Sequence, residues 1–287
     1  MNIRTDLALE RHEMHPDEEI KGVNVRVKES ESCRATTIEI TSEEGEAALG
    51  KPKGIYVTLE TESFPDSDIL CDGRLELLIQ SLKELLPEEG TVLVAALGNR
   101  DITPDAVGPL CADSILATRH IPKEAEKKLK LPSLRDVAVI KAGVTGKTGI
   151  ETGEIISGIT EKIKPACVIV IDALAARSVT RLGTAIQLCN TGIEPGSGVG
   201  NRRMAINSKS LGVPVIAVGI PTVVDAATLC FDLTGKSPDE NSFSDMMVTP
   251  KDTDIITSGG ARLIALGINC ALQKNLTREE IISLTSA

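Results

Sequence analysis

The amino-acid sequence predicts a single α/β domain built on a doubly wound, mostly parallel sheet that is flanked by helices. From residue 91 onward, short apolar runs alternate with helical patterns, and this alternation predicts parallel strands joined by crossover helices. Residues 20–60 instead contain segments of period-two alternation, which predict an antiparallel β addition near the N-terminus. No internal repeat or low-complexity linker divides the 287 residues, so we expect residues 1–287 to form one domain.

The N-terminal third contains two kinds of segment. The first twenty residues are polar and rich in charge, which predicts an exposed arm. Residues 21–28 and 36–40 alternate with period two, as half-exposed strands do, and residues 55–59 give a third strand. We expect these three strands to form an antiparallel element packed beside the main sheet.

The elements of the main sheet follow in order. A helix is predicted from Arg74 to Leu86, because leucine and isoleucine recur on one face and Pro87 ends the pattern. The apolar runs that predict strands are residues 91–97, 136–141, 167–171 and 213–219. Helices are expected to begin near Asp105, Gly153, Arg202 and Thr222, and a last helix covers residues 258–274.

The composition excludes several classes of protein. The net charge is −10 and aromatic residues make up 1% of the chain, whereas nucleic-acid binding depends on basic side chains and on aromatic stacking. We therefore expect no nucleic-acid partner. We find no signal peptide and no apolar run long enough to span a bilayer, so we expect no membrane association. Seven scattered cysteines predict reduced thiols in a cytosolic compartment, and three histidines do not favour a His-based zinc site.

Carboxylates follow two of the predicted buried strands. Asp101 and Asp105 come after residues 91–97, and Asp172 comes directly after residues 166–171. The carboxyl ends of the strands in an open α/β sheet form the ligand crevice. Because neighbouring carboxylates cannot both ionise cheaply, two Asp side chains there can serve as an acid/base pair.

Each of these carboxylates also has a simpler interpretation. Thr103 can cap a helix with Pro104 in its first position, and Asp105 would then favour the positive end of the helix dipole. Asp172 can likewise cap the helix that follows its strand. Asp225 also follows a buried strand, either as an auxiliary carboxylate or as a capping residue.

Two glycine-rich segments precede helices. Residues 192–203 include Gly196, Gly198, Arg202 and Arg203, and their spacing does not match the dinucleotide fingerprint. The segment is either a tight surface loop or a substrate-facing loop, and we favour the second because so many glycines cost folding entropy. Residues 143–149 fail the P-loop pattern because Lys141 stands where its first glycine is required. These glycines can still form an anion-binding nest.

Several longer motifs resemble the germination protease (spore protease) family, in order and over nearly the whole chain. They are Arg4-Thr-Asp-Leu-Ala-Leu-Glu10, Thr103-Pro-Asp-Ala-Val-Gly-Pro109, Asp172-Ala-Leu-Ala, Gly192-Ile-Glu-Pro-Gly-Ser-Gly-Val-Gly-Asn201, Gly219-Ile-Pro-Thr-Val-Val-Asp-Ala226 and Met247-Val-Thr-Pro-Lys251.

This resemblance implies an endopeptidase that degrades small acid-soluble spore proteins at germination, in the cytoplasm of the forespore or spore core. It implies a fold similar to that of the hydrogenase-maturation endopeptidases, and a homotetramer made as an inactive precursor. The catalytic aspartates of the family fall on Asp105 and Asp172, in an atypical aspartic peptidase with no cofactor and no metal. Asp101 has no catalytic counterpart in that pattern.

The N-terminal segment resembles a substrate of such a peptidase. Family substrates resemble an acidic residue, a large apolar residue, alanine and a further acidic residue, and residues 5–10 have this form. We therefore predict self-cleavage between Asp6 and Leu7, with residues 1–6 as a short pro-segment and the arm as a tethered pseudo-substrate. Acidic positions need cationic partners, for which the candidates are Arg177, Arg181, Arg202 and Arg203.

Three alternatives remain open from the residues alone. A metal-dependent endopeptidase could use Asp105, Asp172 and Asp225 on a divalent ion. A non-enzymatic protein could bind nickel or a peptide on the same fold. A nucleotide-binding role is the third, although the broken P-loop spacing counts against it.

Overall fold

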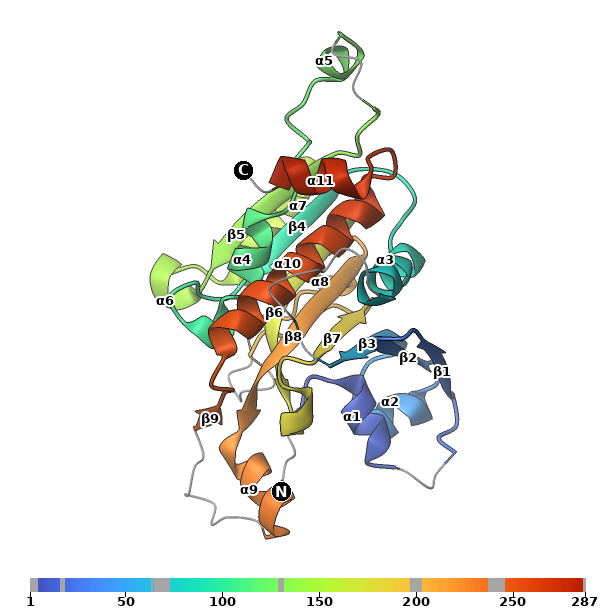
Figure 1. The fold of residues 1–287 in the computed structure, drawn as a ribbon, viewed down its shortest axis with the longest axis vertical. Helices are drawn as coiled ribbons and strands as arrows, with labels where there is room; N and C mark the ends of the chain where they lie inside the picture. The colour runs from blue at the N-terminus through green and yellow to red at the C-terminus, as the bar shows by residue number, and fades with distance from the viewer. Residues whose placement is uncertain are drawn as a thin grey trace.

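Nine strands form one twisted sheet that runs through the molecule (Figure 1). The computed structural model describes residues 5–15, 19–62, 64, 73–128, 132–196, 203–236 and 246–285. The strand order is β1-β2-β3-β7-β8-β6-β4-β5, and β9 pairs with β8. The strands are β1 (Val23–Glu29), β2 (Cys33–Ile40), β3 (Gly54–Thr61), β4 (Val92–Leu97), β5 (Val137–Gly143), β6 (Cys167–Ala176), β7 (Ala185–Cys189), β8 (Val215–Asp225) and β9 (Met247–Val248).

One half of the sheet is parallel, as the sequence predicts. Strands β8, β6, β4 and β5 are parallel neighbours. All six residues of β4 are buried, and nine of the ten residues of β6 are buried. Helices cover both faces of such a sheet, which is why these strands are apolar along their whole length rather than alternating.

The other half is antiparallel and continuous with the first. The β1-β2-β3 meander confirms the predicted antiparallel addition, but it is joined to the main sheet rather than packed beside it as a separate element. Strand β3 forms an antiparallel ladder with β7, and β7 forms another with β8. Helix α2 (Glu43–Leu49) joins β2 to β3, and Ser42 caps it by accepting a hydrogen bond from the Gly45 backbone N–H.

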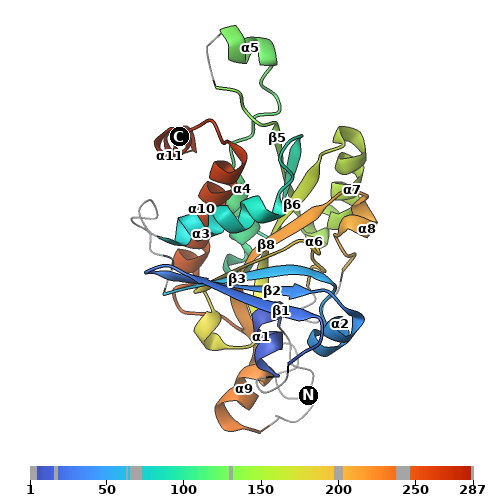
Figure 2. The ribbon, with the colours of Figure 1, turned by 90° about the vertical axis from the view of Figure 1, so that its right-hand side faces the viewer.

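Helices cover both faces of the sheet, and Figure 2 shows the two sides. The larger apolar cluster lies between one face and the helices α3 (Gly73–Leu85), α4 (Val107–Asp113) and α10 (Thr253–Leu272). On the opposite face, α7 (Thr152–Ile163) and α8 (Ser208–Leu211) cover the parallel strands. The remaining helices are α1 (Ala8–Glu13), α5 (Lys123–Lys128), α6 (Thr145–Thr148), α9 (Ala226–Thr234) and α11 (Arg278–Thr285).

Helix α10 has the length and hydropathy to cross a membrane, although no run this long was expected from the sequence. Of its most apolar window, 72% is buried inside the fold. Leu263, Ile264 and Ile268 belong to the larger apolar cluster. Its apolar residues are therefore accounted for by packing within this fold.

Residues 7–10 of the N-terminal arm are buried, contrary to the expectation from its charge. Leu7 and Ala8 are completely buried, and Glu10 is only 2% exposed. Ala8 and Leu9 pack with Tyr56 and other residues of the antiparallel strands. The groups that pair with the polar residues of the arm come from distant parts of the chain. Local sequence does not reveal these partners, so it predicts that the arm faces solvent.

Two strands extend further than their apolar runs predict. Strand β6 continues to Ala176 and β8 to Asp225, because the two strands remain paired with each other beyond Asp172. The helix expected near Thr222 therefore begins at Ala226. The helix expected near Arg202 is the short α8, which begins at Ser208, and Arg202 itself lies outside the described residues.

The connections place a crevice between β4 and β6. The chain leaves β4 through α4 on one face, whereas α8, between β6 and β8, lies on the other face. Adjacent strands whose connections leave toward opposite faces form a topological switch point, where ligands of open α/β sheets bind. Asp105 and Asp172 are both located at this point.

Candidate active site

Asp105 lies in a short turn that follows β4. It ends the 3₁₀ helix Thr103–Asp105, and its carboxylate accepts a hydrogen bond of 2.8 Å from the backbone N–H of Asn99. The turn closes tightly, because a Cβ on Gly98 would lie 2.2 Å from the Asp105 carbonyl oxygen. No side chain caps this helix, so Thr103 is not the capping residue that the simpler interpretation requires.

Asp172 lies within β6 and does not cap a helix. It is 7% exposed, and its carboxylate accepts a 2.9 Å hydrogen bond from the backbone N–H of Ala173. The strand continues for four more residues, to Ala176. A buried carboxylate within a strand that forms no ion pair with any described residue carries a desolvation cost that packing alone does not require.

Gly108 brings the two aspartates close together. It lies in the first turn of α4, where a Cβ would be 2.2 Å from the Leu97 carbonyl oxygen and 2.7 Å from that of Ile171. Real Cβ atoms do not approach oxygen so closely, so only glycine allows α4 to contact the end of β4 and the middle of β6 at once. Asp105 immediately precedes α4, and the approach therefore places it next to Asp172.

Both carboxylates line one cavity of about 400 Å³. Its wall combines the ends of β4, β6 and β8 with three other segments of the chain. These segments contribute Asp6 from the N-terminal arm, Gly143 to Thr145 after β5, and Ile193 to Gly196 with Arg203 from the glycine-rich region. The volume is in the range of sites that bind small molecules or a few residues of a peptide.

The cavity favours the protonated form of both aspartates. Burial raises the pKa of Asp172 well above its ordinary value, and the nearby charges of Asp105 and Asp6 raise it further. Burial also raises the pKa of Asp105, although the Asn99 N–H partly opposes this by stabilising the carboxylate. A pair of interacting carboxyl groups with raised pKa values can hold one proton between them near neutral pH.

The N-terminal arm enters this cavity in an extended conformation. The Asp6 backbone N–H donates to the Ala175 carbonyl oxygen at 2.9 Å, and the Asp6 carboxylate accepts from the Ala175 N–H at 2.8 Å. Leu7 follows with extended backbone angles and packs against Leu174 and Leu182. The arm thus occupies the edge of the sheet beside Asp172, as a bound peptide would.

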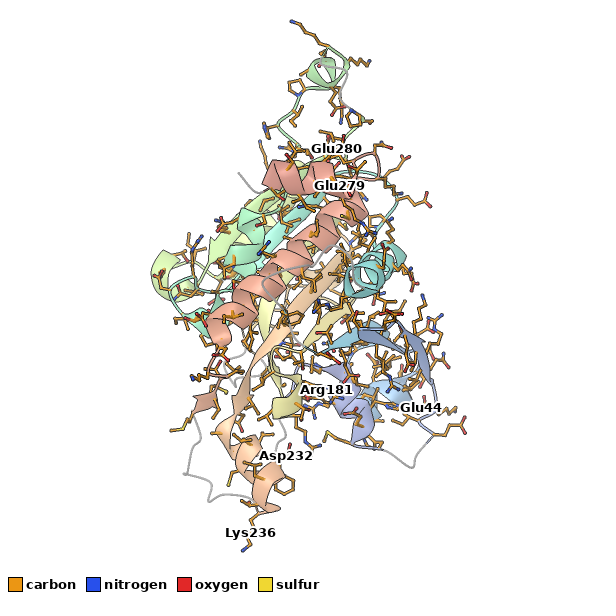
Figure 3. All side chains as sticks on the ribbon, viewed as in Figure 1. Glu44, Arg181, Asp232, Lys236, Glu279 and Glu280 are labelled. Atoms are coloured by element: carbon orange, nitrogen blue, oxygen red, sulfur yellow. The ribbon has the colours of Figure 1, made fainter. Side chains whose placement is uncertain are left out.

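Glu10 anchors the arm on the C-terminal side of Leu7. Its carboxylate accepts hydrogen bonds from the backbone N–H groups of Arg177 at 2.7 Å and Ser178 at 2.9 Å. Arg181, labelled in Figure 3, lies 3.6 Å from the same carboxylate and forms two bonds of 2.6 and 2.7 Å with Glu13. Buried carboxylates need such partners, so this contact fixes the register of the arm.

The predicted arginines and glycines occupy different places. Arg203 and Gly196 line the cavity, and Arg203 lies 3.2 Å from Glu151. Arg181 contacts the arm, whereas the Arg177 side chain pairs with Asp232 of α9. Gly198, like Arg202, lies outside the described residues.

Asp225 is not brought together with the other two carboxylates. It caps α9 and accepts hydrogen bonds from the Thr228 backbone N–H at 2.9 Å and the Thr228 hydroxyl at 3.0 Å. It does not line the cavity. Its place therefore matches the capping role. Among the described residues, no group of three or more His, Cys, Asp or Glu side chains is arranged to hold a metal ion.

Comparison with known proteins assigns the chain to a family. The sequence model described as germination protease matches residues 3–235. The chain belongs to the germination protease family. Two curated germination proteases illustrate this: that of Caldanaerobacter subterraneus subsp. tengcongensis is 41% identical and that of Clostridium perfringens (strain ATCC 13124) is 43% identical. Each alignment covers 98% or more of both chains.

This germination protease is also similar to one of the solved structures. The [NiFe] hydrogenase maturation protease HycI from Thermococcus kodakarensis KOD1 aligns with a TM-score of 0.40 and 18% identity. The alignment covers 68% of this chain and 99% of that protein.

Two polar residues of this germination protease contact the arm and were not predicted from its sequence. Lys51 and Gln187 both bind the Asp6 carbonyl oxygen. Lys51 lies in a loop that contains glycine and proline, and Gln187 lies in β7, which no pattern predicted. Neither position carries a motif, so only the fold reveals them.

Proposed function

We propose that this germination protease hydrolyses peptide bonds of small acid-soluble spore proteins with Asp105 and Asp172 as its acid/base pair. One observation carries the proposal: both carboxylates share a cavity with Asp6, next to a peptide segment of substrate-like sequence. Membership of the germination protease family supports the reaction class. The acidic arm, bound through backbone N–H groups and Arg181, supports a preference for acidic substrates.

The two aspartates divide the chemistry of amide hydrolysis between them. The reaction needs a base for the attacking water and an acid for the leaving nitrogen. Asp172 is the more buried of the two aspartates. Its burial and the nearby Asp105 charge both raise its pKa and so favour its protonated form. We assign the acid to Asp172 and the base to Asp105, in a pair that titrates as a unit.

The arm makes the chain its own first substrate. We propose that the enzyme is made as a precursor and cleaves itself between Asp6 and Leu7, releasing residues 1–6. Asp6 lines the cavity and binds Ala175, and Leu7 packs in the neighbouring apolar cluster. From family membership we further propose a homotetramer that acts in the spore core, and sedimentation of the purified protein tests the assembly.

Intact mass spectrometry of wild type and Asp105→Asn tests this function. Both proteins are incubated at mildly acidic pH with a chelator, alone and with an added small acid-soluble spore protein. We expect the wild type to lose residues 1–6 and to cut the added protein after acidic residues, and we expect the variant to do neither. Activity that disappears with chelator and returns with one metal would replace the aspartate pair by a metal-dependent reaction. If the wild type leaves both proteins intact, a binding function replaces the proposal.

A further inference from the structure

The carbonyl oxygen of Asp6 accepts hydrogen bonds from two side chains. Lys51 Nζ lies 2.9 Å from it, and Gln187 Nε2 lies 2.7 Å from it. Both distances are those of donors in an oxyanion hole, which are typically 2.7–3.1 Å from the oxygen they stabilise. This carbonyl belongs to the Asp6–Leu7 peptide bond, the bond that the proposed function assigns as the cleavage site.

The sheet places Gln187 opposite Asp172 across one strand. Gln187 of β7 pairs with Gly219 of β8, and Gly219 pairs with Asp172 of β6. Paired residues in neighbouring strands face the same side of a sheet, so Gln187 and Asp172 face the same side two strand spacings, or roughly 10 Å, apart. Gly219 itself has no side chain, and the Leu174 side chain packs over it, 2.6 Å from where a Cβ would lie.

Gln187 holds the peptide on both sides of the bond. Its Nε2 donates to the Asp6 carbonyl oxygen, and its Oε1 accepts from the Ala8 backbone N–H at 2.7 Å. The side chain is 6% exposed, so water competes little for either contact. The two bonds fix the orientation of the Asp6 carbonyl, with its oxygen directed at the donors.

Lys51 brings a positive charge to the same oxygen. Burial lowers the pKa of this ammonium group, and the nearby Asp6 carboxylate opposes that shift. Lys51 is half-buried, and a desolvated ammonium group is costly unless its charge is used. The matched neighbour Lys53 is exposed and pairs only with surface glutamates, Glu43 and Glu46, among the described residues.

We propose that Lys51 and Gln187 form the oxyanion hole of this peptidase and are catalytic residues alongside the two aspartates. This inference rests on the proposed function, because it needs Asp6–Leu7 to be a scissile bond. The same donors would bind the carbonyl of the acidic residue in an added substrate once the arm has left.

The step balances with water as the only co-reactant. Water attacks the Asp6 carbonyl carbon and gives a proton to the ionised carboxylate, and the electron pair of the C=O π bond moves to the oxygen held by Lys51 and Gln187. When the tetrahedral intermediate collapses, this pair reforms the C=O bond and the C–N bond breaks. The Leu7 nitrogen takes the proton from the protonated aspartate, which leaves a carboxyl group on Asp6 and an amino group on Leu7.

Self-processing tests this inference directly. The substrate is tethered, so the first-order rate of self-cleavage depends on the chemical step rather than on substrate binding. The rate of loss of residues 1–6 is measured by intact mass for wild type, Lys51→Met, Lys51→Arg and Gln187→Glu, with Lys53→Met as the matched control. Gln187→Glu keeps the acceptor for Ala8 and removes the donor to Asp6. Hydrogen exchange at Leu7–Glu10 measures whether the arm stays bound.

We expect Lys51→Met and Gln187→Glu to slow processing by about 10²- to 10³-fold each, the effect of removing one oxyanion donor. Exchange protection of the arm should stay near that of the wild type, Lys51→Arg should recover part of the rate, and Lys53→Met should process normally. Wild-type rates in both variants overturn the inference. A rate loss matched by loss of protection also overturns it, because the two residues would then only anchor the arm.

An Asp172→Asn variant separates this inference from the function on which it rests. If wild type processes and Asp172→Asn does not, while Lys51→Met and Gln187→Glu process at the wild-type rate, only the oxyanion hole is wrong. If Asp172→Asn processes as fast as wild type, the aspartate pair is wrong. If wild type never cleaves after Asp6, both proposals fall together.

Discussion

The carboxylate of Asp105 contributes to the raised pKa of Asp172, its neighbour across the switch point of the sheet. Burial is the larger cause, and the second charge adds to it. The two side chains come from sequence positions 67 residues apart, but Gly108 allows α4 to pack closely over the end of β4 and the middle of β6. This coupling makes the pair suited to sharing a proton.

Replacing either aspartate by asparagine should remove most of the activity. We expect Asp105→Asn and Asp172→Asn to lower kcat by roughly 10²- to 10⁴-fold, the usual contribution of general acid–base catalysis. The measurement is the rate of cleavage of a small acid-soluble spore protein by variants whose circular dichroism matches the wild type. Asp225→Asn is the control: asparagine also caps helices, so its kcat should change little. Near-normal turnover in either active-site variant contradicts the pair.

The same Asp172→Asn substitution should stabilise the protein at neutral pH. The pKa of Asp172 is raised in the folded protein, so above its ordinary value the folded chain keeps a proton that the unfolded chain has released. Stability therefore falls as pH rises through this window, and the asparagine variant avoids the loss. Asparagine also retains the oxygen that accepts from Ala173.

Thermal unfolding at several pH values measures this effect. We expect the Tm of Asp172→Asn to exceed that of wild type at pH 7, by about 2–4 °C for each kcal/mol gained. The difference should shrink as the pH falls through 4 and vanish below the ordinary pKa of 3.8, where the aspartate is protonated in both states. A variant that is less stable than wild type at pH 7 would show that the ionised carboxylate is favoured in the fold.

A methyl group at Gly108 should disrupt the active site by displacing the backbone of α4. Gly108→Ala places a Cβ against the Leu97 and Ile171 carbonyl oxygens, so α4 must move. We expect a loss of about 1–3 kcal/mol in the free energy of unfolding, typical of overpacking, together with reduced activity. Gly158→Ala is the comparison, because Gly158 lies in α7 with no atom near its Cβ position. The free energy of unfolding of that variant, measured by urea titration, should rise by about 0.5–1 kcal/mol. Equal effects at both sites would contradict this prediction.

Removing the cation that binds the arm should free it. Arg181→Met leaves the buried Glu10 carboxylate without this partner and breaks the paired bonds to Glu13. Loss of one partner of a buried ion pair typically costs about 3–5 kcal/mol. Part of that cost should appear as faster hydrogen exchange in residues 7–13.

The matched control for the arm is Arg177→Met. Arg177 also forms an ion pair, with Asp232 of α9 at 3.0 Å, but its contact with Glu10 is through the backbone and survives the substitution. Exchange in residues 7–13 should therefore stay near the wild-type rate. If the two variants loosen the arm equally, the Arg181 side chain is not what holds it.

The central strands of the main sheet could be predicted because each contains a continuous apolar run in the sequence. The apolar runs at residues 91–97 and 167–171 are continuous, and they became the central strands β4 and β6. The two aspartates were predicted from their place after these runs, and both line the cavity. Strand β7 was missed because its five residues are all buried and Gln187 interrupts the apolar run.

The arm and its partners could not be predicted from local pattern. Glu10 is a charged residue in a charged segment, and its burial depends on backbone groups at Arg177 and Ser178, far along the chain. Lys51 and Gln187 become a pair only when β3 and β7 meet and the arm crosses them. Long-range contacts of this kind leave no periodicity in the sequence.

The anchoring of Glu10 has a consequence for what cleavage achieves. A cut after Asp6 releases six residues but leaves Leu7, Ala8 and Glu10 covalently attached, so they compete for the site at a fixed local concentration whatever the dilution of the protein. Tethered groups on short linkers act at effective concentrations in the millimolar range. Under the proposed self-cleavage, an added substrate would have to displace this tethered segment, and we expect departure of α1 from the sheet, rather than bond cleavage, to set when the cavity becomes accessible to other chains.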